Sequence, residues 1–208
     1  RVPASTFKIF NTLIAYETGV VTDDKKLFKW DGKPKWIKAW EQDLNIRQAI
    51  AFSAVPVYQQ IAREIGAVRM VSFLKQLDYL SISGGITRFW LDGGLVISAV
   101  EQIEMLEKLY HARLPVSKEG QAFVKDILPA AKRGCFTAHG KTGWAFTNKK
   151  PDHGWWVGWA QQTSEAKPIY FALNADVRDK SQLGLRQSLV FDVLHDFVQL
   201  REKECQVN

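Results

Sequence analysis

The sequence predicts an α+β fold, with helices in its first part and an antiparallel sheet after them. Up to about residue 128, short helix-like segments alternate with breakers such as Gly19 and Ser83-Gly84-Gly85. After Pro129 the pattern changes to short strand-like runs. Two of these runs, 155–160 and 169–175, are joined by the polar segment 161–167, which indicates a hairpin.

Local signals place the starts and ends of the helices. A first helix begins at Ser5 and ends near Glu17, before Gly19. Ser98-Ala99-Val100-Glu101 is a capping box, which opens a helix over 100–112. A final amphipathic helix is expected over 185–200. Its apolar residues are Leu189, Val190, Val193, Leu194 and Phe197. The other expected elements are helices over 46–51, 57–65, 67–77 and 120–128 and a strand over 136–142.

The composition fits one domain with a sizeable core, because 46% of the 208 residues are hydrophobic. We expect two lobes, a helical lobe over about 20–130 and a sheet-and-helix lobe made of 1–19 and 131–208. The formal net charge is +6, but Lys and Arg are spread among acidic and aromatic residues, so nucleic-acid binding is not expected. No apolar run is long enough to span a membrane, and no signal peptide is visible.

The cysteines and histidines give no sign of a metal site. Cys135 and Cys205 could pair only if the C-terminal tail folds back, and we expect both to be free thiols. The histidines lack partners at metal-ligand spacing, so no metal is expected. If strand residues alternate, His139 lies on the same face as Lys141, where it either lines a site or is a structural histidine with satisfied hydrogen bonds.

The most informative motif is Ser5-Thr6-Phe7-Lys8, which precedes an apolar run. A spacing of i, i+3 puts Ser5 and Lys8 on one helix face, close enough to touch. A hydroxyl beside an amine can act as an activated nucleophile, and a helix N-terminus favours negative charge on the serine oxygen. Alone, S-x-x-K is common and also fits a helix with a solvated lysine.

Two further motifs make the signal specific. Ser53-Ala54-Val55 precedes the helix expected over 57–65, and Lys141-Thr142-Gly143 follows a strand-like run. The order S-x-x-K, S-x-V, K-T-G is far more specific than any one member. With these motifs the chain resembles the serine β-lactamase and penicillin-binding protein superfamily, and above all the class D β-lactamases. The resemblance runs from Arg1 to about residue 200 and also rests on Phe28-Lys29-Trp30-Asp31-Gly32, Phe89-Trp90-Leu91, Gly154-Trp155-Trp156-Val157-Gly158-Trp159 and Leu185-Arg186.

The resemblance implies a β-lactamase/transpeptidase-like fold, a helical lobe packed on an antiparallel sheet flanked by helices, with the site between the lobes. It makes Ser5 the nucleophile, Ser53 a proton relay and Lys141 a positive group near the substrate carboxylate. Backbone N–H groups of Ser5 and Trp144 would form the oxyanion hole. The residues that it places around the substrate are Val55, Thr142, Gly143, Trp144 and Arg186, with Thr142 and Arg186 on the substrate carboxylate.

Lys8 is the candidate base, but an ammonium group cannot accept a proton. Burial can lower the pKa of a lysine, so a neutral amine is one solution. The resemblance implies another, in which Lys8 reacts with CO2 and the resulting carbamate is the base in acylation and deacylation. Trp90 matches the family tryptophan whose indole N–H bonds this carbamate, and a core aromatic is the plain alternative. No other cofactor is expected.

The implied activity is hydrolysis of β-lactam antibiotics, small-molecule substrates, by a periplasmic enzyme, with a homodimer as an open option. Two alternatives are a class D-like sensor domain that is acylated without turnover and a penicillin-binding D,D-peptidase. In the family, strands normally precede the nucleophile; either that segment lies outside this sequence or the sheet has an unprotected edge. Tyr79-Leu80-Ser81 departs from the family's Tyr-Gly-Asn, and the interval to Trp90 is shorter, which puts loop shape and substrate range in doubt.

Overall fold

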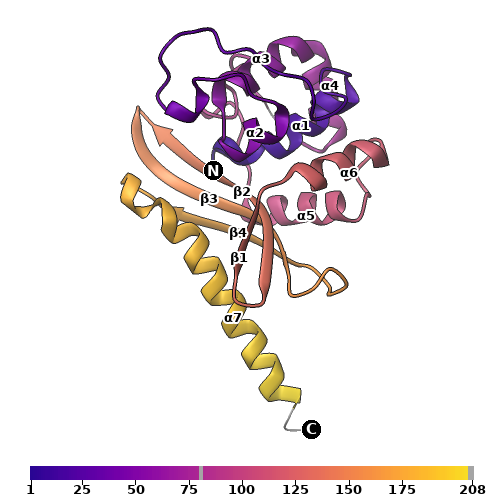
Figure 1. Ribbon diagram of the computed structural model, residues 1–208, viewed down its shortest axis with the longest axis vertical. Coiled ribbons are helices and arrows are strands. Elements are labelled where there is room, and N and C mark those ends of the chain that lie inside the picture. Colours follow the sequence, from indigo (N-terminus) through magenta and orange to yellow (C-terminus); the bar gives the residue numbers. More distant parts are fainter. Residues whose placement is uncertain (80–81, 206–208) are drawn as a thin grey trace.

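The computed structural model describes the backbone of residues 1–79 and 82–205, and the side chains as far as residue 197. The sheet has four antiparallel strands in the order β1-β2-β3-β4 (Figure 1). They are β1 Ala130–Arg133, β2 Phe136–Thr147, β3 Lys150–Gln161 and β4 Ile169–Asp176. The fold is therefore α+β with an antiparallel sheet, as the sequence predicts.

The expected hairpin between β3 and β4 is confirmed by the pairing of Ala160 with Ile169. The sequence patterns do not predict the hairpin between β2 and β3, nor the pairing of β1 with β2. In the β2–β3 turn, Asn148 and Lys149 have φ angles of 51° and 63°, the left-handed pair that suits a two-residue hairpin. Because lysine stands where glycine is usual, the sequence carries only half of the Asn-Gly signal.

Every expected helix is present, with bounds shifted by a few residues. The helices are η1 Ala4–Phe7, α1 Lys8–Glu17, η2 Lys38–Trp40, α2 Ile46–Ala51, α3 Val55–Ile65, α4 Ala67–Gln76, α5 Ala99–Tyr110, α6 Lys118–Ile127, η3 Lys180–Gly184 and α7 Leu185–Cys205. The first expected helix opens as the 3-10 turn η1 and continues as α1. The capping box of Ser98 and Glu101 at the start of α5 is confirmed by two reciprocal hydrogen bonds.

The two faces of the sheet pack against different helices. Residues that alternate along β3 separate into two apolar clusters. Trp155, Val157 and Trp159 belong to the main core with the helices α1 to α6, while Trp156 and Ala160 pack with α7. Residues paired across an antiparallel ladder share a face, so Lys141, opposite Val157, faces the main core side.

The apolar face of α7 is narrower than the sequence predicts. Val190 and Leu194 are buried as expected, together with Phe191. Leu189, Val193 and Phe197 are instead 45%, 67% and 43% exposed, which corrects that part of the prediction. The physical reason is that the helix touches one small face of the sheet, so only residues on one side of its 3.6-residue period reach the cluster.

The 3-10 helix η1 joins the sheet to the helices. It contacts β2 and β3, whereas α1 packs against α2, α3 and α6. The side-chain hydroxyls of Thr12 on α1 and Tyr58 on α3 are 2.8 Å apart and fully buried.

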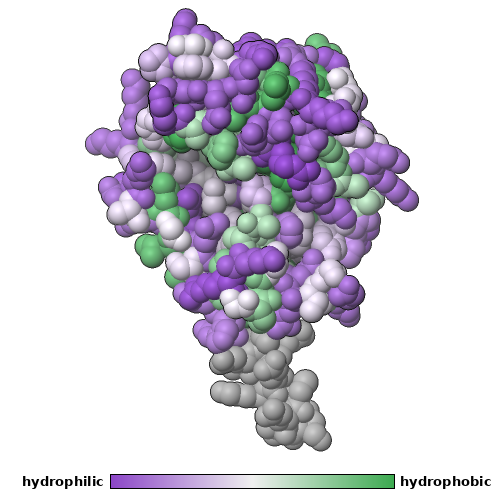
Figure 2. Space-filling view, in the orientation of Figure 1, coloured by the Kyte–Doolittle hydropathy of each residue, from purple (hydrophilic) through white to green (hydrophobic). Residues whose placement is uncertain are grey.

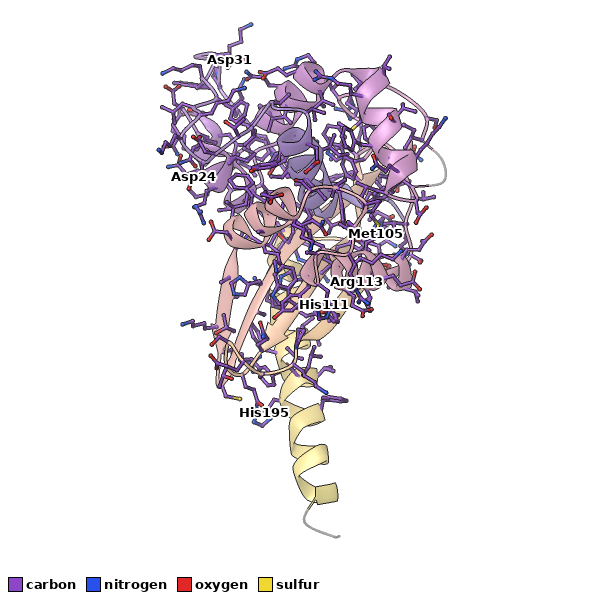
Figure 3. The ribbon with its side chains drawn as sticks, turned by 90° about the vertical axis from the view of Figure 1, so that its right-hand side faces the viewer. Asp24, Asp31, Met105, His111, Arg113 and His195 are labelled. Atoms are coloured by element: carbon purple, nitrogen blue, oxygen red, sulfur yellow. The ribbon has the colours of Figure 1, made fainter. Side chains whose placement is uncertain are left out.

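The surface shown in Figure 2 is dominated by hydrophilic side chains over the helices. Figure 3 shows Asp24 and Asp31 at the end of the molecule opposite His195, which lies on α7. Cys135 is an exposed free thiol, as expected, and the Cys205 side chain lies outside the described residues. In the part of the chain that the structure describes, no helix is long and apolar enough to cross a membrane.

Candidate active site

Ser5 and Lys8 meet where η1 passes into α1. The Nζ of Lys8 donates a hydrogen bond of 2.6 Å to the Oγ of Ser5, so the predicted contact at i, i+3 exists. Ser5 is half-buried, while Lys8 is completely buried. Ala4, directly before Ser5, has a φ angle of 50°, a left-handed conformation that strains a residue with a side chain. The chain thus leaves Ser5 partly exposed and buries the amine of Lys8 beside it.

The surroundings of Lys8 favour its neutral form. Burial lowers the pKa of the Lys8 amine well below its usual value, and the nearby positive charge of Lys141 lowers it further. The Nζ atom also lies 5.3 Å from the centre of the buried Tyr58 ring. A neutral amine keeps a lone pair that can accept a proton or form a bond to carbon.

Trp90 lies on the apolar side of this site and is completely buried. Its ring stacks on Phe7, with centroids 5.7 Å apart, and Phe7 directly precedes Lys8. Among the described residues no group accepts a hydrogen bond from the buried Nε1 of Trp90. A tryptophan that served only as a core aromatic would normally have this N–H satisfied.

Strand β2 brings Lys141, Thr142 and Gly143 beside η1. Lys141 is 2% exposed, and its Nζ donates to the Thr142 carbonyl at 3.1 Å. Burial, and then the charge of Arg186, lower the pKa of Lys141 to about 7. A Cβ on Gly143 would lie 2.9 Å from the Pro3 carbonyl oxygen, so glycine is what lets η1 come this close to the strand. A small cavity of about 110 Å³ adjoins Lys141 and Thr142.

Arg186 approaches the same strand from the first turn of α7. Its Nη1 donates to the Gly143 carbonyl at 2.6 Å, and its Nε donates to the Leu183 carbonyl at 2.8 Å. The side chain is 8% exposed, and burial lowers its pKa to about 10. Read alone, Arg186 fits a solvated helix residue, but the structure buries it next to the K-T-G strand.

Ser53 and Val55 lie at the turn between α2 and α3. Ser53 has a φ angle of 56°, again in the left-handed region, and is half-buried. Val55 is the first residue of α3 and packs against the main core. Tyr58, one turn further on, contacts both Thr12 and Lys8. No hydrogen bond of the Ser53 hydroxyl is found among the residues that the structure describes, and none links it to Ser5.

An aromatic cluster at Trp144 is absent from the sequence-based prediction. Trp36 is 71% exposed, yet it stacks on Trp144 with centroids 6.3 Å apart. Its edge also meets Trp40 and Phe146. The indole of Trp144 donates to the Val177 carbonyl at 3.0 Å. The available signal was a group of tryptophans in the otherwise polar segment 23–45, next to a motif tryptophan.

Two other residues singled out in the sequence lie apart from this chemistry. His139 does share a strand face with Lys141, but it stacks on Trp159 and its buried Nδ1 has no partner among the described residues. Tyr79 is buried against Phe7 and Phe10, while Leu80 and Ser81 lie outside the described residues. A larger cavity of about 410 Å³ between α4 and residues 82–89 touches none of the predicted site residues.

The described residues contain no group of three or more His, Cys, Asp or Glu side chains that could hold a metal ion. What the arrangement offers is a serine hydroxyl that is hydrogen-bonded to a buried amine whose pKa is lowered, with Lys141 and Arg186 on the neighbouring strand and helix. The backbone N–H of Ser5 stands at the start of η1, where helix geometry leaves it without an intrahelical acceptor. These are the parts that acyl transfer to serine requires.

Comparison with known proteins agrees with this geometry. The penicillin binding protein transpeptidase domain family matches residues 1–195. The chain is 50% identical over 191 residues to β-lactamase OXA-10 of Pseudomonas aeruginosa. The aligned region covers 90% of this chain and 71% of that protein. It is 46% identical over 194 residues to β-lactamase OXA-48 of Klebsiella pneumoniae, and the aligned region covers 92% of this chain and 72% of that protein.

Solved structures give the same result. The class D β-lactamase FUS-1 (OXA-85) of Fusobacterium nucleatum superimposes with a TM-score of 0.87 at 41% identity, covering 95% of this chain and 82% of that one. The class D β-lactamase YbXI from Nostoc superimposes with a TM-score of 0.85 at 40% identity, covering 92% and 81%. The chain therefore belongs to the penicillin-binding-protein transpeptidase family and, within it, to the class D serine β-lactamases.

Proposed function

We propose that this protein hydrolyses β-lactams through an acyl-serine intermediate on Ser5, with an N-carboxylated Lys8 as the general base. The carboxylation of Lys8 is proposed because of the indole N–H of Trp90, which is fully buried and has no acceptor among the described residues. A buried donor of this kind costs about 1–3 kcal/mol unless a partner arrives. A carbamate on the buried Lys8 is an anionic acceptor of the right chemistry.

The residues present fit the formation of that group. Carboxylation needs a neutral amine, and burial lowers the pKa of Lys8 well below its usual value. The Nζ lone pair attacks the carbon of CO2, one C=O π bond becomes a carboxylate oxygen, and a proton leaves nitrogen for solvent. The carbamate supplies a base that can take a proton from Ser5 and later from water. Its negative charge is balanced locally by Lys141, which already acts on Lys8 through space.

Ser5 carries the covalent chemistry in this proposal. Its Oγ attacks the lactam carbonyl carbon while the hydroxyl proton moves to the base. The C–N bond of the four-membered ring then breaks, and the nitrogen takes up a proton, for which the Ser53 hydroxyl is the proposed relay. A water molecule, deprotonated by the same base, attacks the ester carbonyl and releases Ser5. Ser5 and Trp144 backbone N–H groups stabilise the oxyanion in both halves.

Substrate orientation is assigned to the cations beside β2. A β-lactam bears a carboxylate, and a guanidinium binds carboxylates in a planar, two-pronged manner. Arg186 is held in place by its bonds to the carbonyls of Gly143 and Leu183, and Thr142 adds a hydroxyl at the same edge. Val55, at the start of α3, is assigned to the apolar wall of the substrate pocket. We also assign the enzyme to the periplasm, because β-lactams pass through this compartment of the cell envelope.

Two measurements test the proposal separately. For the nucleophile, intact-mass spectrometry after incubation with penicillin should show a penicilloyl adduct on the parent and none on Ser5→Ala; the surface variant Ser188→Ala is the matched control. An adduct on Ser5→Ala would move the nucleophile elsewhere.

For the base, nitrocefin turnover should rise on adding bicarbonate to CO2-depleted protein, and 13C-bicarbonate should give a carbamate signal in the 13C spectrum. Turnover that ignores bicarbonate, without such a signal, would leave the neutral amine as the base. A single equivalent of adduct with no turnover would instead indicate a sensor.

A further inference from the structure

Asn11 on α1 is a completely buried amide with no hydrogen bond at either end. Among the described residues, its Nδ2 and Oδ1 make up half of the buried side-chain atoms without partners. The others are Trp90 Nε1 and His139 Nδ1. Each unmet buried group of this kind carries the full desolvation penalty of a lost hydrogen bond. A native core rarely keeps a whole amide in this state, so we expect a buried water or a group bound nearby to satisfy it.

The position of Asn11 points to Lys8 as the place where that ligand forms. Asn11 follows Phe7 by four residues and Lys8 by three, so the three side chains share one side of the helix. Helical side chains lean toward the N-terminus and cover the turn before their own Cα. The amide therefore lies over the turn that carries Phe7 and Lys8. Phe7 in turn stacks on Trp90, the other unsatisfied donor of this region.

The neighbouring polar residues are satisfied, which isolates Asn11. Thr6 donates to the Pro3 carbonyl and accepts from Gln102. Thr12 donates to the Lys8 carbonyl and shares a hydrogen bond with Tyr58. The Nζ of Lys8 itself donates a hydrogen bond to the Oγ of Ser5. Asn11 is thus not a member of a local polar network that the fold needs, and its amide is left for something that is added to Lys8.

We propose that Asn11 is a positioning residue for the carboxylated form of Lys8. A carbamate presents an N–H donor beside an anionic oxygen, and a primary amide presents an acceptor beside an N–H donor. The two groups are complementary, so both unsatisfied ends of Asn11 find partners at once, while Trp90 bonds the second oxygen. The inference rests on the carboxylation of Lys8 and adds a residue that would hold the group and favour its formation.

The test compares carbamate formation in the parent, Asn11→Leu and Gln121→Leu. Gln121 is a suitable control because it is an equally buried amide, but all its bonds are to the segment 114–117, far along the chain from Lys8. CO2-depleted protein is titrated with 13C-bicarbonate at fixed pH, and the carbamate signal gives the half-saturating concentration. We expect this concentration to rise at least 10-fold in Asn11→Leu and to stay unchanged in Gln121→Leu.

Thermal unfolding in CO2-free buffer supplies a second readout. Replacing an unsatisfied amide by an apolar side chain of similar size is expected to leave the melting temperature of Asn11→Leu unchanged or to raise it. Gln121→Leu should lower it, because satisfied backbone groups lose their partner. If Asn11→Leu fails to fold, Asn11→Asp serves instead, since a carboxylate lacks the N–H donor and repels the carbamate.

The outcomes distinguish the role of Asn11 from the carboxylation of Lys8. A carbamate signal in the parent with the same half-saturation in Asn11→Leu would overturn the role of Asn11 and leave the carboxylated lysine intact. No signal in the parent at any bicarbonate concentration would overturn both.

Discussion

A Cβ atom on Gly143 would lie 2.9 Å from the carbonyl oxygen of Pro3. The same glycine accepts a hydrogen bond of 2.6 Å from Arg186. Gly143 is therefore the point where the turn that carries Ser5, the strand that carries Lys141 and the helix that carries Arg186 come into contact. The glycine of the K-T-G motif acts here through the space it leaves free.

Gly143→Ala should push η1 away from β2 and weaken catalysis. The added methyl group cannot be accommodated without movement of backbone, and such overpacking typically costs about 1–3 kcal/mol of stability. Since a shift of about 1 Å can cost two orders of magnitude in rate, we expect kcat/KM for penicillin to fall at least 10-fold. Gly85→Ala is the control, because a Cβ there meets nothing within 4 Å. Equal kinetics of Gly143→Ala and the parent would contradict this account.

Arg186→Ala should weaken substrate recognition more than it slows the chemical step. The lost hydrogen bond to a charged group is worth about 1–3 kcal/mol, so kcat/KM should fall about 5- to 150-fold, mainly through KM. Arg133→Ala removes a surface arginine that pairs with Asp192 and serves as control. Steady-state kinetics with benzylpenicillin decide the point, and an unchanged kcat/KM would remove Arg186 from the substrate site.

Trp90→Phe should separate the indole N–H from the packing of the ring. Trp90→Ala also opens a cavity, which typically costs about 3–5 kcal/mol, so loss of activity there has two explanations. Phenylalanine keeps most of the stacking on Phe7 but removes the donor. We expect Trp90→Phe to accumulate acyl-enzyme and to need added bicarbonate for turnover, as seen by stopped-flow and mass spectrometry. Parental turnover, indifferent to bicarbonate, would make Trp90 a core aromatic.

Stability should rise with pH above neutrality because of the buried lysines. The pKa of Lys141 is about 7 in the folded protein and 10.5 in the unfolded chain. Between these values the unfolded state binds one more proton, so the free energy of unfolding increases with pH, by up to about 1.4 kcal/mol per pH unit. Below pH 7 this contribution is constant.

Urea unfolding between pH 7.5 and 9.5 measures this slope, and Lys141→Met should reduce it. Lys8 contributes with the same sign, because its pKa is also lowered, so some slope should remain in the variant. Tyr58, whose pKa is raised by burial, acts in the opposite direction only at higher pH. A slope in Lys141→Met equal to that of the parent would show that Lys141 is protonated throughout this range.

Local signals predict the contacts that are close in sequence and fail for those set by distant packing. Ser5 and Lys8 touch because helical spacing alone brings them together, and the Ser98 capping box is equally local. The burial of Arg186 depends on the carbonyl of Gly143, 43 residues away, which no local pattern encodes. The exposure of Val193 on α7 likewise reflects how little of the sheet that helix covers.

Asn11 and Trp36 illustrate two reasons why residues near the site cannot be predicted from local sequence patterns. An asparagine in an apolar helix looks like an exposed polar residue, and only its complete burial makes it conspicuous. A tryptophan in a polar segment looks like a pocket wall at most, and only the stack on Trp144 ties it to the K-T-G strand. In both cases the informative quantity is an environment created by other parts of the chain.

The left-handed backbone of Ala4 and Ser53 sets a limit on how this protein can adapt. Each such residue costs on the order of 1–3 kcal/mol, out of a total folding free energy of about 5–15 kcal/mol for a typical domain. Both conformations aim a serine of the site, so relaxing them would favour the fold and harm turnover. We therefore expect the protein to be less thermostable than its fold would allow without these two conformations. Substitutions near the site that destabilise the fold further are expected to be tolerated only together with stabilising changes elsewhere.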